Sequence, residues 1–143
     1  MRDRRFDSTI RNARRKPLTP EQIERQVQRY RERFLAFRAI NIGRTQAGQA
    51  LNQARHESYQ QAVDSGDLDE SQIQRIWNTN IDSRERLSHN VLHRSTVRGL
   101  SERYETSTGA RLLHPIDPNG PAGEVINCRC TETFGITAIP NRT

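Results

Sequence analysis

A long stretch of helix-forming sequence constrains this chain more than any other feature. Thr19 can cap a helix, Pro20 suits its first turn, and Gln22 completes a capping box. Ser65-Gly66 provides a stop signal. An uninterrupted helix between these signals holds about 44 residues and spans roughly 65 Å. The sequence therefore predicts a rod that makes up a large part of the molecule.

Apolar residues mark one face of this helix. In its first half they recur at steps of four and three residues, at Ile23, Val27, Tyr30, Phe34 and Phe37. The pattern continues more weakly at Ile40, Ala47, Leu51, Ala54, Tyr59 and Ala62. Gly43 and Gly48 are positions at which the helix can kink. Because a remainder of about 80 residues cannot cover so long a stripe, we expect part of the helix to pack on another chain.

The rest of the chain predicts a small irregular module, so the expected fold class is α+β. We divide the chain into a basic arm (1–18), a long helical region (19–66) and an α+β module (67–143). Within the module, Gly, Pro and Asn signals separate short segments. We expect a strand or short helix at 72–77, a capped turn or short helix at 82–89, and strands at 96–98, 110–113 and 129–136.

Composition limits what can stabilise this module. Only 32% of the residues are hydrophobic and the mean hydropathy is −0.93, whereas an average domain is nearly half apolar. We therefore expect support from a metal, an oligomeric neighbour or a larger assembly. The sequence has no apolar run long enough for a membrane span and no secretory signal. These features predict a soluble protein made in a cytoplasm.

The net charge of +6 is concentrated near the N-terminus. Residues 1–38 hold 12 basic and 5 acidic residues, a net charge of +7, and the remainder carries −1. Arginine forks bind phosphate and carboxylate well. Four helix arginines are therefore candidates for contact with nucleic acid or an acidic partner: Arg25, Arg29, Arg33 and Arg44. The alternative is a solvated helix face.

Cys128 and Cys130 are the only cysteines and are separated by one residue. Such close neighbours rarely form an unstrained disulfide, but two thiolates facing one point supply half of a tetrahedral zinc site. Asp117, held between Pro115 and Pro118, is our candidate for a further ligand. Alternatively, the cysteines are small residues of a hairpin and Asp117 stabilises a turn.

Several separated motifs, taken in order, resemble one known family. They are Arg38-Ala39-x-x-Ile42-Gly43-Arg44-Thr45-Gln46, Ala50-Leu51-Asn52, Trp77, Asp82-Ser83-Arg84-Glu85-Arg86-x-x-His89, Gly109-Ala110-Arg111-Leu112, Pro115-x-Asp117-Pro118 and Glu124-x-Ile126-Asn127-Cys128-Arg129-Cys130. The chain resembles the phage Mu F-like minor head (head morphogenesis) proteins over roughly residues 20–134. It departs from them at 43–46, where the family usually has Ala-Arg-Thr-Glu, and in the short region before the first helix.

The resemblance implies a structural protein of the phage head rather than an enzyme. Expected partners are the portal protein, capsid or scaffold proteins, packaged DNA and further copies bound through the long helix. The expected location is the virion, near the portal or inside the capsid, after assembly in the host cytoplasm.

The resemblance also completes a predicted zinc site. His89 matches the motif histidine and becomes the third ligand, beside Cys128, Cys130 and Asp117. His93 and His114 are competing ligands, since each is a histidine of the same predicted module.

Two other functional classes fit parts of the sequence. A metal-dependent hydrolase, nuclease or toxin-like prophage module needs an open metal position, a general base and basic phosphate-binding residues. The sequence has no paired carboxylates next to the cysteines. A small nucleic-acid-binding domain is supported only by the charge of the arm.

Overall fold

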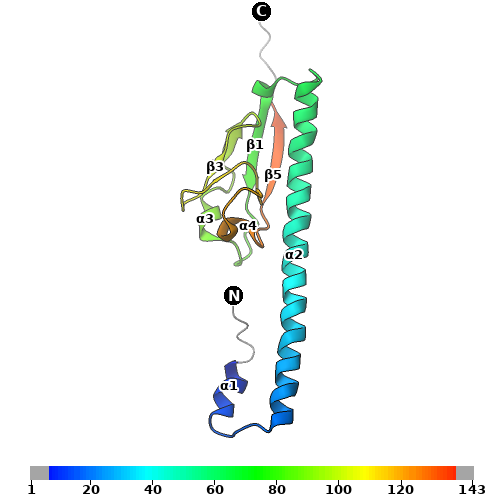
Figure 1. Cartoon of the computed structure of the whole chain (residues 1–143). Coiled ribbons are helices and arrows are strands. Elements are labelled where there is room, and N and C mark those ends of the chain that lie inside the picture. Colours follow the sequence, from blue (N-terminus) through cyan, green and yellow to red (C-terminus); the bar gives the residue numbers. More distant parts are fainter. Residues whose placement is uncertain (1–6, 138–143) are drawn as a thin grey trace, which may run out of the picture. The chain divides into compact units, whose positions relative to one another are not determined.

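A computed structural model describes residues 7–137. The chain divides into two compact units, Met1–Asn41 and Ile42–Thr143, and the division falls inside the long helix (Figure 1). The first unit contains α1 and the first half of α2, and the second contains the second half of α2 and all later elements. The elements are α1 (Asp7–Ala13), α2 (Pro20–Asp64), the 3-10 turn η2 (Glu70–Gln72), β1 (Ile73–Asn78), α3 (Leu87–Asn90), β2 (Thr96–Arg98), β3 (Tyr104–Glu105), β4 (Arg111–Leu112), α4 (Ala122–Val125) and β5 (Thr131–Ile136).

The predicted long helix is confirmed. Gln22 N donates to Thr19 Oγ1 at 3.3 Å and Thr19 N donates to Gln22 Oε1 at 3.0 Å, so both halves of the capping box form. The helix ends where Gly66 adopts a φ of 81°. It passes through Gly43 and Gly48 without a break. Among the described residues, no helix combines the length and the apolar character that crossing a membrane requires.

The second half of α2 packs on the module through small and polar residues. Thr45 and Asn52 are its two buried residues, and a Cβ on Gly48 would lie 2.5 Å from the side chain of Ile116. Further along the same face, the Tyr59 ring stacks on Phe134 with centroids 4.1 Å apart. The prediction that Leu51 belongs to the packed apolar face is wrong, because its side chain is 50% exposed. Around Thr45 and Gly48 the helix approaches the module closely, because the side chains at this part of the contact face are small.

The module contains a three-stranded antiparallel sheet with the order β2-β1-β5. The segment 72–77, which the sequence left between strand and helix, forms β1, and its side chains alternate between buried and half-buried. The predicted strand at 96–98 is confirmed as β2. The predicted strand at 110–113 is shorter and pairs with β3 in a separate two-stranded sheet. Figure 1 shows β1 and β5 beside the second half of α2.

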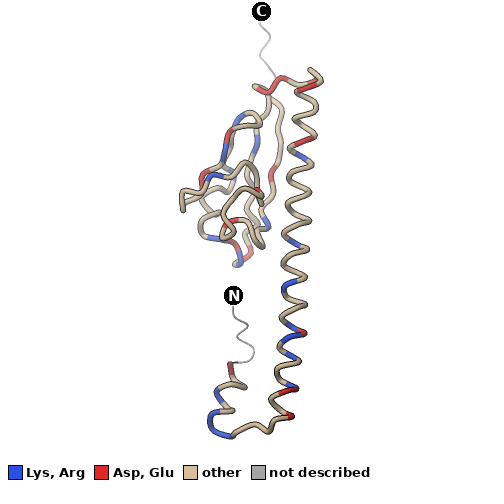
Figure 2. The backbone as a smooth tube through the Cα atoms, viewed as in Figure 1, with Lys and Arg blue, Asp and Glu red and all other residues tan. Residues whose placement is uncertain are grey.

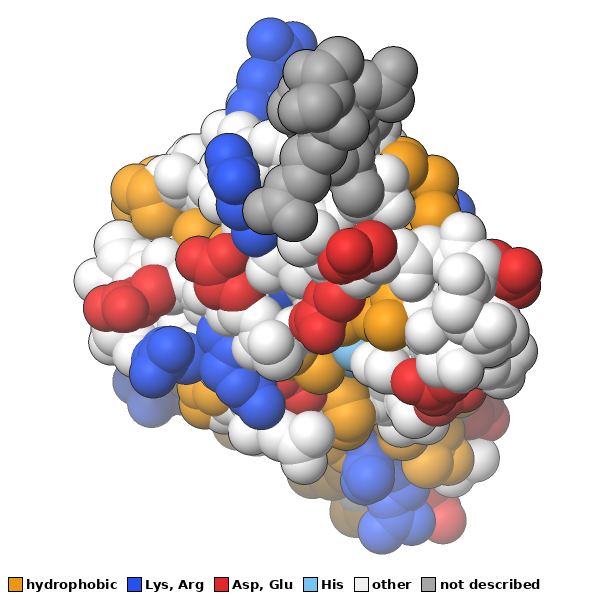
Figure 3. Space-filling model, turned by 90° about the horizontal axis from the view of Figure 1, so that it is seen from above, with side chains coloured by type: hydrophobic (Ala, Val, Ile, Leu, Met, Phe, Trp, Pro, Cys, Tyr) orange, Lys and Arg blue, Asp and Glu red, His pale blue; other side chains and the backbone are white. Residues whose placement is uncertain are grey.

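The apolar core of the module is small. Trp77 lies at its centre, fully buried, with its ring edge-on to Tyr104 at 5.1 Å and to His89 at 5.3 Å. Both cysteines belong to the same buried cluster. Figure 3 shows one face of the molecule, on which charged side chains of both signs are interspersed with small groups of hydrophobic ones. The thin core predicted from composition is present.

A buried arginine compensates for this small core. Arg75 is fully buried, and its guanidinium donates to Gly99 O at 2.7 Å, Leu113 O at 2.6 Å and Glu132 Oε1 at 3.1 Å. The same Glu132 oxygen accepts from Tyr104 Oη at 2.9 Å. Burial raises the pKa of Glu132 even though Arg75 acts to lower it. One side chain thus joins β1 and β5 to two loops.

We predict that Arg75→Ala lowers the free energy of unfolding by about 3–5 kcal/mol, because it leaves the Glu132 carboxylate buried without its cation. The control Arg98→Ala lies on the neighbouring strand, where the side chain is exposed, and should change stability by about 0.5 kcal/mol or less. Urea unfolding followed by the fluorescence of Trp77 measures both. Equal losses in the two variants would show that the buried arginine is not a main support of the fold.

Candidate metal centre

The candidate centre joins two segments of the module. His89 lies on the short helix α3, and the two cysteines lie between α4 and β5. Asn127 turns the chain into the cysteine segment with a φ of 63°, a conformation that asparagine tolerates better than most residues. Asn127 N also donates to Thr45 Oγ1 of α2 at 3.0 Å. The cysteine segment is therefore held against the second half of the long helix.

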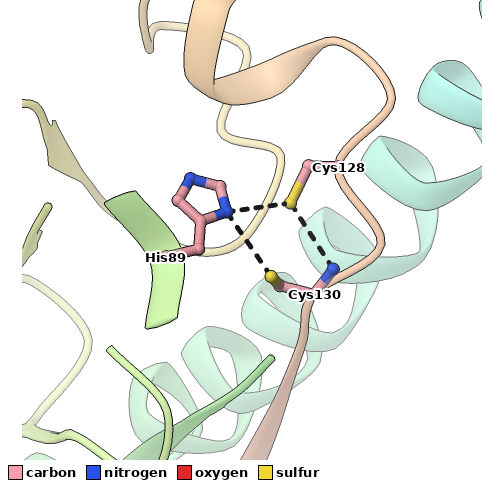
Figure 4. Close-up of side chains that lie close together, drawn as sticks. All are labelled: His89, Cys128 and Cys130. Carbon is pink, nitrogen blue, oxygen red and sulfur yellow. Dashed lines mark hydrogen bonds between the residues drawn. The ribbon is translucent and has the colours of Figure 1, made fainter. Parts of the chain in front are cut away.

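The side chains of His89, Cys128 and Cys130 converge on one point. His89 Nδ1 lies 3.5 Å from each sulfur (Figure 4), and the three ligand atoms all lie within 4.8 Å of one another. Zinc bonds of about 2.05 Å to nitrogen and 2.3 Å to sulfur, at a tetrahedral angle, place the two atoms about 3.6 Å apart. The three residues are buried. The arrangement fits a tetrahedral thiolate and imidazole metal site.

The thiols are already polarised without a metal. The hydrogen bond with Cys128 lowers the pKa of Cys130 to about 4, and His89 acts in the same direction. The same contact and burial raise the pKa of Cys128. Cys130 N also donates to Cys128 Sγ at 3.4 Å. A metal ion that binds here would replace the thiol protons, because cysteine binds a metal as the thiolate.

Glu124 faces the other side of the histidine ring. Its Oε2 lies 2.9 Å from His89 Nε2, although the ring N–H is not aligned for a regular hydrogen bond. Ser88 donates to Oε2 at 2.7 Å and Thr108 to Oε1 at 2.6 Å. Burial acts to raise the pKa of Glu124, but these hydrogen bonds hold it below its usual value. With the Glu124 carboxylate beside Nε2 of His89, the other ring nitrogen, Nδ1, is free to bind a metal.

The structure does not bring Asp117 to this cluster. Its carboxylate accepts from Leu113 N at 2.8 Å and Asn119 N at 2.9 Å, and it pairs with Arg103 at 3.3 Å. These bonds hold a turn in which Ile116 has a φ of 62°, an unfavourable conformation for a β-branched residue. Asp117 therefore has the turn-stabilising role that the sequence left as the alternative.

The competing histidines lie elsewhere. His93 Nδ1 accepts from Thr79 N at 3.2 Å. The buried His114 has its Nδ1 3.0 Å from Pro115 O and its ring beside that of His56. Neither side chain belongs to the group that could hold a metal.

Arginines around the cluster fasten the cysteine segment. Arg129 forms an ion pair with Asp82, and Arg86 donates to Ile126 O. Arg44, which the sequence offered as a partner contact, donates to Asn127 Oδ1 at 3.2 Å. Asp82 and Arg86 of the 82–89 segment are thus tied to the cysteine segment rather than to each other.

Sequence reasoning missed Glu124 as part of the centre. The residue stands four positions before Cys128, within the motif that contains both cysteines. That proximity was the available signal, but only the fold shows that Glu124 faces His89.

Comparison with known protein families identifies the chain. The family model for Phage Mu protein F like protein matches residues 7–133, which include the whole candidate centre. The chain belongs to the Mu F-like family. It is accordingly a phage head-related protein of a structural family. No curated protein and no solved structure matches this Mu F-like chain.

We predict that the Mu F-like chain binds one zinc ion per molecule, measured by elemental analysis. Cys128→Ser, Cys130→Ser and His89→Ala should each reduce this stoichiometry because each removes a donor. Asp117→Asn should retain one zinc because the carboxylate serves the turn. A folded Asp117→Asn variant that loses zinc would instead support the ligand set predicted from sequence.

A chelator adds a stability measurement to this prediction. Removal of zinc should lower the melting temperature of the wild type, because metal binding contributes to folding. The already zinc-depleted Cys128→Ser variant should show little further change. An unchanged wild-type melting temperature would contradict a structural role for the metal.

We also predict that Glu124→Gln lowers zinc affinity about tenfold or more, since partners of this kind typically contribute 10–100-fold. The control Glu105→Gln changes an exposed residue of β3 and should leave the affinity unchanged. Competition with a chromophoric chelator measures both. Equal affinities would show that Glu124 does not orient His89.

Proposed function

We propose that this protein is a minor component of the phage head that associates with the portal during capsid assembly. The observation that carries the proposal is the family match over residues 7–133. We place the protein in the virion, inside the capsid or near the portal, after assembly in the host cytoplasm. Capsid or scaffold proteins are further candidate partners.

We propose structural zinc as the cofactor. The donor set of one imidazole and two thiolates suits zinc, and the spacing of the ligand atoms agrees with tetrahedral coordination. The ion would join α3 to the segment before β5. Such a link closes the long loop between His89 and Cys128 and so reduces the entropy of the unfolded chain. The folded module, which buries little apolar surface, is stabilised as a result.

We propose the first half of α2 as the docking element. Its predicted stripe is exposed over most of its length, since Ile23 is 50%, Val27 43% and Phe37 40% accessible. Tyr30 stacks on Phe34 at 6.0 Å within the same helix. Large apolar side chains in a row, rimmed by charge, are typical of helices that bind another protein. The portal or a second copy of the chain would cover this stripe.

We propose a separate face of the same helix for contact with packaged DNA. Arg25, Arg29 and Arg33 follow each other at intervals of four residues, which places them on one side of α2. At about 100° per residue, the middle of this arginine side lies more than a quarter turn around the helix axis from the middle of the apolar stripe. Figure 2 shows the basic positions along this part of the backbone. Phosphates or an acidic protein surface would suit them.

We predict that Val27→Asp combined with Phe37→Asp weakens binding to purified portal protein at least about 30-fold, because each places a charge in a buried contact. The control Ala39→Asp introduces the same charge on the opposite face of α2, at an exposed position away from the three arginines, and should bind as the wild type does. Pull-down titration measures portal binding, and light scattering measures self-association.

The outcomes separate the candidate partners. Loss of self-association alone would assign the stripe to sibling copies, whereas loss of portal binding alone would assign it to the portal. No effect on either would contradict docking through this helix. Metal-dependent cleavage of DNA by the purified chain would favour the nuclease alternative over a structural role.

A further inference from the structure

The candidate zinc centre has fewer protein ligands than the metal requires. Zinc is almost always bound by four donors. In the part of the chain that the structure describes, the group that could hold a metal contains only His89, Cys128 and Cys130. Asp117, the fourth ligand predicted from sequence, is committed to its own turn. A fourth donor must therefore come from elsewhere.

The three ligands lie at the edge of a surface hollow. Residues of the segments 80–89 and 127–130 line a space of about 230 Å³ that includes open solvent, and His89, Cys128 and Cys130 form part of this lining. The enclosed part has room for about one water molecule. The hollow can therefore admit a single small ligand to the metal, but not a bulky one.

The charges around the hollow favour an oxygen donor with negative charge. Arg84, Arg86 and Arg129 line it, and Glu85 is the acidic residue of the lining. Asp82, which is not part of the lining, pairs with Arg129. A zinc ion with two thiolates and a neutral imidazole is uncharged. The wider cluster is balanced, because Asp82, Glu85 and Glu124 offset the three arginines. The lining of the hollow itself, however, has three guanidinium groups and one carboxylate, which favours a small anion there.

Glu85 is the carboxylate that lines the hollow, so it is an alternative fourth ligand from the chain itself. Its Oε2 accepts from Asp82 N at 3.2 Å, which holds it in the loop before α3. It lines the hollow but lies outside the converging ligand group. A Glu85 ligand would require this bond to break.

We propose that the fourth coordination position of the zinc opens into this hollow and takes an exogenous ligand, a water molecule that one small monodentate anion can displace. This inference rests on the zinc site proposed above. The centre then combines a structural role with an exchangeable position. The protein would sense or bind a small anion at the junction of α3 and the cysteine segment.

Cobalt substitution tests the proposal on the full chain. Cobalt(II) bound by two thiolates gives a sulfur-to-metal charge-transfer band, and its visible d–d bands respond to a change of ligand. Titration with azide, used as the probe, should change the d–d bands in a saturable way while the charge-transfer band remains. Retention of the charge-transfer band shows that both cysteines stay bound.

A matched pair of variants tests the role of the charge. Arg84→Ala should weaken azide binding about threefold, as expected for one nearby charge in a solvent-exposed setting. Arg98→Ala removes an exposed arginine outside the lining and should leave azide affinity unchanged. Equal affinities in the two variants would overturn the part of the proposal that assigns anion preference to the hollow.

The remaining outcomes are distinguishable. Failure to bind cobalt would overturn the zinc site itself and this inference with it. Cobalt binding with d–d bands that azide does not change would leave the metal site standing and overturn the open position. A Glu85→Gln variant whose d–d bands differ from wild type before azide is added would identify Glu85 as the fourth ligand and would also overturn the proposal.

Discussion

The approach of the His89 imidazole to two thiols is the contact on which the small module depends. His89 is 39 residues from Cys128 and 41 from Cys130, so one local contact joins the helix α3 to the segment that enters β5. Glu124 supports the ring from the other side. Directional polar contacts of this kind hold the chain where apolar burial is limited. The buried Arg75 has the same function on the sheet.

The two halves of α2 have different surface chemistry, which suits them to different contacts. Its second half contacts the module through Thr45, Gly48 and Asn52, whose small size permits close packing. Its first half carries large exposed apolar side chains such as Ile23 and Phe37. The exposed half is the surface that we propose for docking to other head components, while the packed half holds the module.

The sequence predicted local features well and long-range contacts poorly. The capping box at Thr19 and the strand at 96–98 were predictable because both depend on neighbouring residues. The stripe on the second half of α2 was predicted correctly at Tyr59, which stacks on Phe134, but not at Leu51, which is exposed while Thr45 and Asn52 are buried. Asp117 looked like a ligand because it stands between prolines in a motif. The fold uses it instead to hold the strained turn at Ile116.

The sequence by itself determined the long capped helix, the thin core, the concentration of positive charge and the pair of thiols, because each is a property of composition or close spacing. It also pointed to His89 through the family resemblance. Only the tertiary structure decided that His89 meets both sulfurs, that Glu124 stands behind the ring and that Asp117 lies apart. These facts depend on how distant segments pack, and a pattern along the chain carries no distance between residues far apart in sequence.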